Sequence, residues 1–157
     1  MTVSGELDGI KFYGASLVMD SRVAVRYYFV ADSIADVHFT ANGNTYNADE
    51  KSGLFYVEIP DILPQNYSQN ILLTAQKGDE KLEISYSPLT YIVRMSEKGS
   101  ATMQALVKAM YGYHQAAVSY LNNRVSFSMY RNTEIAYFSS GEEKFEKLKE
   151  ELKKAVQ

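Results

Sequence analysis

The spacing of apolar residues changes from that of strands to that of a helix at about residue 87, and no other feature of the sequence constrains the fold as strongly. Through residues 10–97, short segments alternate apolar and polar residues, which predicts strands that each bury one face. From Ser87-Pro88 onward, apolar residues begin to recur every three or four positions, which predicts helical structure. A chain with many strands followed by a long helix belongs to the α+β class, so we expect a mostly β fold.

Short strands with turn signals between them fill the first part of the chain. The clearest pair is a hairpin of residues 71–76 and 82–86 around Gly78-Asp79. A second turn signal is Asn42-Gly43-Asn44, because Asn and Gly adopt positive φ at low cost. In residues 22–30 every second residue is apolar and shares one face: Val23, Val25, Tyr27 and Phe29. Strands at this spacing predict an antiparallel β-sandwich.

A long helix is predicted to follow the strands. Ser100 can cap its N-terminus, and the helical spacing continues to about Asn122. Its apolar residues fall on one stripe, namely Met103, Leu106, Val107, Met110, Tyr113, His114, Ala117 and Leu121. Such a stripe has to be buried, so we expect the helix to pack on the sandwich. On this basis Leu106→Asp is expected to unfold the module.

Residues 124–157 form a second predicted region, a β-hairpin followed by an amphipathic helix, while residues 1–123 form the sandwich with its closing helix. The extension is either integral to the fold or fused to it. Residues 140–143 read as a capping box, so Ser140→Ala should cost about 1 kcal/mol at most. The narrow apolar stripe of Phe145, Leu148 and Leu152 is the predicted surface for binding a partner protein.

Composition and charge exclude several classes of partner. The 157 residues are 46% apolar and 22% charged, which is typical of a globular domain. The formal charge of −3, with both signs interspersed, gives no basic surface for nucleic acid. No apolar run approaches the roughly 20 residues of a membrane span, so membrane insertion is not expected. With no cysteine, disulfides and thiolate chemistry are excluded.

No catalytic motif, cofactor motif or metal site is recognisable in the sequence. Of the two histidines, His114 lies beside the helix stripe and is expected to pack or hydrogen-bond, and His38 is expected to face solvent. Residues 47–50 are rich in oxygen but lack the spacing of an EF-hand calcium loop. A hydrolase with two carboxylates brought together from distant loops stays open as a minor alternative.

Tyrosine is the most abundant aromatic residue, with 13 copies, and the sequence contains no tryptophan. Tyr27 and Tyr28 are neighbours on a predicted strand, so one of them must point away from the core. An exposed row of tyrosines could stack on sugar rings or contact a partner peptide. We therefore predict Tyr27, Tyr28, Tyr46 and Tyr56 as ligand-binding residues. The alternative is that these tyrosines only fill strand positions.

Three segments carry a resemblance to a known type of module. The helix segment LVKAMYGYHQAA at 106–117, the preceding SYSPLTYI at 85–92, and the opening strands at 14–17 and 23–29 resemble a β-rich module found in large secreted surface proteins of gut Firmicutes. The resemblance covers about residues 5–123 and not the extension. It implies a secreted, wall-associated setting within a multi-domain protein, and it brings no catalytic residues with it.

The sequence therefore predicts a non-catalytic, extracellular accessory module that supports neighbouring domains and binds a polysaccharide or a protein. The alternative is a protein–protein interaction module that acts through its C-terminal hairpin and helix. The first ten residues are polar and do not resemble a signal peptide. This leaves two settings open, namely a fragment of a longer secreted chain, or a cytoplasmic protein if Met1 is the natural start.

Overall fold

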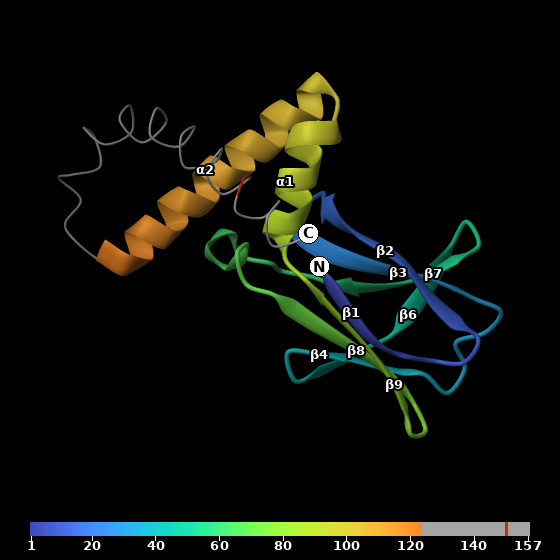
Figure 1. Cartoon of the computed structure of the whole chain (residues 1–157). Helices are drawn as coiled ribbons and strands as arrows, with labels where there is room; N and C mark the ends of the chain where they lie inside the picture. Colours follow the sequence, from blue (N-terminus) through green and yellow to red (C-terminus); the bar gives the residue numbers. More distant parts are fainter. Residues whose placement is uncertain (124–149, 151–157) are drawn as a thin grey trace. The chain divides into compact units, whose positions relative to one another are not determined.

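The computed structural model describes residues 1–123 and Glu150, and it is β-rich with two antiparallel sheets and two α-helices (Figure 1). The order is β1-β9-β8-β4-β5 in the five-stranded sheet and β2-β3-β7-β6 in the four-stranded sheet. The strands are β1 Thr2–Glu6, β2 Ile10–Met19, β3 Val23–Ala31, β4 His38–Ala41, β5 Asn44–Tyr46, β6 Ala48–Lys51, β7 Leu54–Ile59, β8 Ile71–Lys77 and β9 Glu80–Tyr86. The predicted mostly β, α+β class is confirmed.

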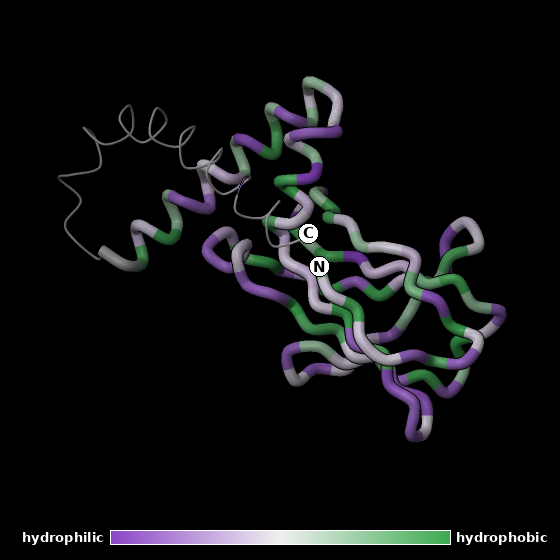
Figure 2. The backbone as a smooth tube through the Cα atoms, in the orientation of Figure 1, coloured by the Kyte–Doolittle hydropathy of each residue, from purple (hydrophilic) through white to green (hydrophobic). Residues whose placement is uncertain are grey.

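Alternation of apolar and polar residues decides which face of strand β3 is buried. Along β3 the side chains of Val25, Tyr27 and Phe29 are buried, and those of Arg26 and Tyr28 between them are partly exposed. Figure 2 shows the same alternation of hydrophobic and hydrophilic residues along the strands. The period of two in the β3 sequence therefore matches the alternation of buried and exposed side chains in the structure.

Aromatic residues from the two sheets meet at their buried faces. The rings of Phe29 in β3 and Phe39 in β4 lie 5.4 Å apart, and those of Tyr27 and Tyr86 lie 6.3 Å apart edge to face. The Tyr27 hydroxyl also donates a hydrogen bond of 2.9 Å to the backbone carbonyl of Ile71 in β8. The ring burial and this hydrogen bond both connect the four-stranded sheet to the five-stranded sheet.

Two predicted turns are confirmed by the backbone. Asn42 and Gly43 have φ values of 51° and 77°, the positive pair that a tight hairpin turn requires, and they join β4 to β5. Gly78, with φ of 58°, lies between β8 and β9, and these strands pair antiparallel as the predicted hairpin. The residues that allow positive φ thus set the register of both hairpins.

The chain divides into two compact units. Unit 1 comprises Met1–Leu63 and Gln69–Pro88, and unit 2 comprises Pro64–Ser68 and Leu89–Gln157. Both sheets belong to unit 1. The described part of unit 2 contains a single 3₁₀ turn, η1 Pro64–Asn66, with most of α1 Pro88–Lys98 and α2 Ala101–Asn123. The predicted division at residue 123 coincides with the end of the continuous described segment and stays a prediction.

The helix boundaries follow the predicted signals. Pro88 opens α1, where its missing N–H is tolerated. The Ser100 hydroxyl accepts a hydrogen bond of 3.3 Å from the Met103 backbone N–H, so Ser100 is the N-cap of α2 as predicted. The described part of helix α2 reaches Asn123 and so includes the predicted extent to about Asn122. Among the described helices, none combines the length and the apolarity needed to cross a membrane.

The prediction that all eight stripe residues of α2 are buried is wrong in detail. Val107, Tyr111 and His114 are buried, with Val107 fully inaccessible, whereas Leu106 is 43% exposed and Tyr113 is 65% exposed. The reason is geometric, since 106 and 107 differ by about 100° around a helix. The predicted hairpin and the predicted C-terminal helix lie outside the described residues, apart from Glu150.

The corrected burial gives a matched pair of variants on α2. We expect Val107→Asp to lower the free energy of unfolding by about 3 kcal/mol or more, because it buries an uncompensated carboxylate. Leu106→Asp should cost about 1 kcal/mol or less, because the side chain can reach water. Urea denaturation followed by circular dichroism measures both. Equal losses in the two variants would contradict the assignment of the buried face.

Edge strand β1 depends on a glycine at position 5. Gly5 has φ of 77°, and a Cβ atom built there would overlap the backbone carbonyl oxygen of Lys81 in β9. Gly9 has a similar φ of 73° but open space around its Cβ position. Gly9→Ala should therefore cost only the positive-φ strain, about 1 kcal/mol. Gly5→Ala should cost clearly more and should increase hydrogen exchange of the β1 amides, which exchange measured by mass spectrometry would report.

Candidate ligand-binding surfaces

The outer face of the four-stranded sheet carries a cluster of polar and aromatic side chains. We call it the Tyr28 cluster, and it consists of Ser16 in β2, Arg26 and Tyr28 in β3, and Tyr56 and Glu58 in β7. Strand pairing sets Arg26 between Ser16 and Glu58 in one cross-strand row, and it sets Tyr28 beside Tyr56 in the next. Each of these positions is next to at least one buried residue on its strand, so their side chains share the outer face.

An ion pair organises the cluster. The Arg26 Nε atom lies 2.6 Å from Glu58 Oε2, and the guanidinium carbon lies 4.6 Å from the centroid of the Tyr56 ring. Burial opposes the charged form, but hydrogen bonding and the charge of Glu58 outweigh it and raise the pKa of Arg26. The two side chains are 23% and 27% exposed. The positive and negative charges therefore satisfy each other at a half-buried position, and no free charge is presented.

The two tyrosines are held side by side. Their ring centroids lie 6.1 Å apart with the planes inclined by 45°, and the Ser16 hydroxyl donates a hydrogen bond of 3.3 Å to the Tyr28 hydroxyl. Both residues are partly exposed. Gly14 pairs with Tyr28 on the neighbouring strand β2 and leaves open space at its Cβ position. The result is a surface that combines two partly exposed tyrosine rings with hydroxyl groups.

The other two predicted ligand-binding tyrosines lie elsewhere. The prediction for Tyr27 is wrong, because its ring is fully buried and its hydroxyl is engaged by Ile71, so no ligand at the surface can reach it. Tyr46 is partly exposed but lies in β5 opposite Phe39, in the five-stranded sheet. The sequence indicated that one of two adjacent tyrosines must point outward, and the structure assigns that position to Tyr28.

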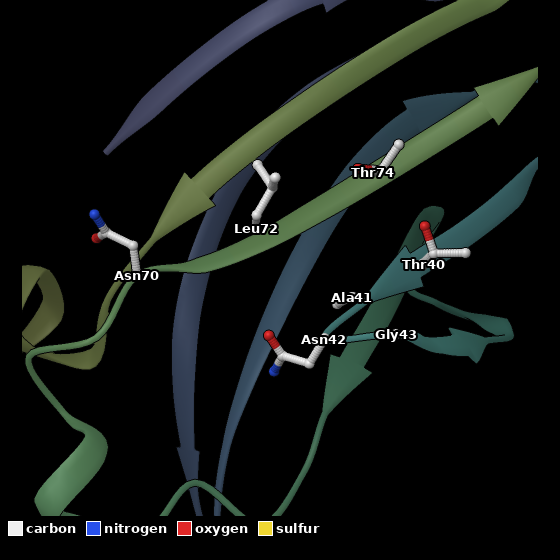
Figure 3. Close-up of a pocket in the computed structure, with 7 residues that line it drawn as sticks. All are labelled: Thr40, Ala41, Asn42, Gly43, Asn70, Leu72 and Thr74. Carbon is white, nitrogen blue, oxygen red and sulfur yellow. The ribbon is translucent and has the colours of Figure 1, made fainter.

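The outer face of the five-stranded sheet bears a second candidate, which we call the threonine hollow (Figure 3). It is an open depression of about 480 Å³ lined by Thr40, Ala41, Asn42, Gly43, Asn70, Leu72 and Thr74. Figure 3 shows Leu72 and Thr74 along β8, Thr40 on the adjacent β4, and the Asn42-Gly43 turn at one end. Thr40 and Thr74 are direct cross-strand neighbours.

The lining of the hollow is uncharged and combines polar and apolar groups. Its hydroxyl and amide groups surround the side chain of Leu72, which is 47% exposed. Sequence reasoning missed this surface, because Thr40 and Thr74 are 34 positions apart and only the β4–β8 register brings them together. The one available signal was the Asn42-Gly43 turn, which marks the end of β4 but not its partner.

The histidines and carboxylates do not form a reactive centre within the described residues. His114 is buried, its Nδ1 atom lies 2.6 Å from the Pro64 carbonyl oxygen, and its ring stacks on Tyr67 at 5.9 Å. This confirms the predicted packing and hydrogen-bonding role of His114. His38 is exposed at the start of β4, as predicted. In residues 1–123, no three histidine or acidic side chains converge in a way that could hold a metal ion.

Comparison with known proteins identifies no relative. No protein-family model, no curated protein and no solved structure matches this chain. The function therefore has to be inferred from the chemistry of the Tyr28 cluster and the threonine hollow.

Burial of Tyr27 generates a pH-dependent prediction. Desolvation, with a smaller effect from Tyr86, raises the pKa of Tyr27 well above the value of about 10 expected in the unfolded chain. The hydroxyl stays protonated in the folded state while the unfolded state loses its proton, so this stabilisation is complete below about pH 10 and is lost as the pH rises further. Tyr27→Phe should cost about 1 kcal/mol at pH 7 and should lose stability less steeply above pH 10.

Urea denaturation of both proteins at pH 7 and pH 10.8 provides the measurement. Tyr56→Phe is the matched control, because Tyr56 lies on the partly exposed outer face. If the wild type and Tyr27→Phe lose the same stability between the two pH values, the buried hydroxyl does not titrate as described.

Proposed function

We propose that this chain is a non-catalytic module of a secreted bacterial surface protein that binds a glycan through the Tyr28 cluster. The observation that supports this proposal is the pair of adjacent, partly exposed tyrosine rings on an outer sheet face. The resemblance of residues 5–123 to modules of wall-associated proteins suggests the setting. In this setting the module also supports neighbouring domains of the same protein.

Sugar rings need two kinds of contact, and the Tyr28 cluster offers both. Their apolar C–H faces pack on aromatic rings, and their hydroxyl groups exchange hydrogen bonds with polar side chains. Tyr28 and Tyr56 supply rings and hydroxyls, and the Arg26–Glu58 pair adds polar atoms without a net charge. Because these side chains are already oriented by contacts among themselves, binding would cost little side-chain entropy. A neutral polysaccharide is therefore the favoured ligand.

The architecture we propose for this function is a β-sandwich with two outward sheet faces. Contacts such as Phe29–Phe39 and the Tyr27–Ile71 hydrogen bond support face-to-face packing of the sheets in unit 1. The Tyr28 cluster and the threonine hollow then lie on opposite outer faces. The hollow is the second candidate surface, favoured by its uncharged hydroxyl and amide groups beside the exposed Leu72.

A protein–protein interaction module is the alternative function. In that case the partner contacts come from residues 124–157, including Phe145, Leu148 and Leu152, which lie outside the described residues. The two functions differ in which part of the chain they require. Deleting residues 124–157 leaves the Tyr28 cluster intact but removes the predicted partner surface.

A glycan array with plant, mucin and bacterial wall polysaccharides tests the proposal. We expect saturable binding of a neutral polysaccharide by the purified chain. Tyr28→Ala and Tyr56→Ala should each weaken it, by up to about tenfold, because each removes one stacking ring. Tyr113→Ala is the matched control, since Tyr113 is also a tyrosine that reaches solvent but lies on α2.

The outcomes separate the candidate surfaces. Binding that is lost with Thr40→Ala and Thr74→Ala but unchanged in the tyrosine variants would assign the ligand to the threonine hollow and contradict the Tyr28 cluster. No binding to any polysaccharide, together with a protein partner that is lost on deletion of residues 124–157, would replace the glycan-binding function with the alternative. Circular dichroism of each variant establishes that the fold is retained.

A further inference from the structure

Helix α2 carries more apolar surface than its buried face uses. The buried side chains Val107, Tyr111 and His114 lie within an arc of about 60°. A second arc, about 100° wide and directly beside the first, contains a further set of apolar residues. A surface helix normally has one apolar arc of this width, so the second arc on α2 needs an explanation.

The second arc forms a regular stripe, which we call the α2 stripe. It consists of Leu106, Met110, Tyr113, Ala117, Tyr120 and Leu121. From 106 to 120 the spacing is four, three, four and three residues, the pattern with which one helix packs against another. Leu106, Tyr113, Tyr120 and Leu121 are each between 43% and 65% exposed. Four large apolar side chains exposed on one stripe of one helix indicate a docking surface.

We propose that the α2 stripe is covered by the C-terminal segment of the same chain, residues 143–156, packed antiparallel to α2. This inference is independent of glycan binding. The segment has its own apolar stripe at helical spacing, namely Phe145, Leu148, Leu152 and Val156. Glu150, the one described residue in the segment, is helical.

The segment is long enough to cover the α2 stripe from Met110 to Leu121. At 1.5 Å per residue, the α2 stripe is about 22 Å long and a helix over 143–156 is about 20 Å long. In an antiparallel arrangement Phe145 lies beside Leu121, and Leu152 lies beside Tyr113. The segment then begins near the C-terminal end of α2. Residues 124–142 therefore only have to reverse the direction of the chain. Fully extended, they could span roughly 60 Å, which is much longer than this reversal requires.

Covalent connection and charge favour this occupant over a separate molecule. A short connection raises the effective concentration of the segment at α2 to the millimolar range, which a second copy or a foreign helix seldom reaches. Residues 142–157 contain glutamates and lysines in balance, whereas α2 has a single charged residue, Lys108. The two apolar stripes can therefore meet without like-charge repulsion, and the charged side chains remain in water.

Engineered cysteines give a direct test, because the natural chain has none. The test variant combines Tyr113→Cys with Leu152→Cys in the full-length protein. The matched control combines Tyr113→Cys with Lys154→Cys, since position 154 is two residues away but on the opposite side of a helix. In dilute protein under mild oxidation, the test variant should form its intramolecular disulfide about tenfold faster than the control or more, as judged by mass spectrometry.

A second measurement follows the amides of residues 143–156 by hydrogen exchange. Protection should be present in the wild type and lost in Tyr113→Asp, which places a charge in the α2 stripe at a position that is 65% exposed. Equal disulfide rates in the test variant and control, disulfides that link two chains in a dimer, or protection unchanged by Tyr113→Asp would each overturn the proposal. Inter-chain disulfides would assign the stripe to a second copy instead.

Discussion

Burial of the inner face of β3 is the constraint on which the rest of unit 1 depends. Tyr27 lies at its centre, packs edge to face on Tyr86, and donates a hydrogen bond to the Ile71 carbonyl in the other sheet. A buried hydroxyl without a partner would be costly, so this contact restricts where β8 can lie relative to β3. Phe29 and Phe39 complete the same contact region further along β3.

The outer faces follow from this inner one. Once Val25, Tyr27 and Phe29 are buried, Arg26 and Tyr28 have to face outward, because side chains alternate along a strand. The β3–β7 register then sets Glu58 beside Arg26 and Tyr56 beside Tyr28. A one-residue slip would break the ion pair and bury the wrong face, so the core also maintains the geometry of the Tyr28 cluster.

Helix α2 illustrates how an apolar pattern can serve two surfaces. Val107 and His114 belong to its buried side, while Leu106 and Tyr113 lie on the exposed side, although all four fit one broad helical stripe. The width of an apolar stripe therefore indicates whether a helix can contact more than one surface, which the presence of a stripe alone does not. A helix with a wide apolar arc can contact a second surface. In this chain we propose that the C-terminal segment, which follows α2 in the sequence, makes that second contact.

The sequence by itself determined the local structure of this protein. The period of two predicted the buried face of β3, Asn42-Gly43 predicted the β4–β5 hairpin, and Ser100 predicted the start of α2, because each signal acts within a few residues of the chain. Only the tertiary structure decided which tyrosines share a surface. The β3–β7 register places Tyr28 beside Tyr56, whereas Tyr27 is buried in the core. The β4–β8 register places Thr40 opposite Thr74, although these strands are distant in sequence. Register between distant strands is set by the packing of the whole core, and no short segment of the sequence contains it.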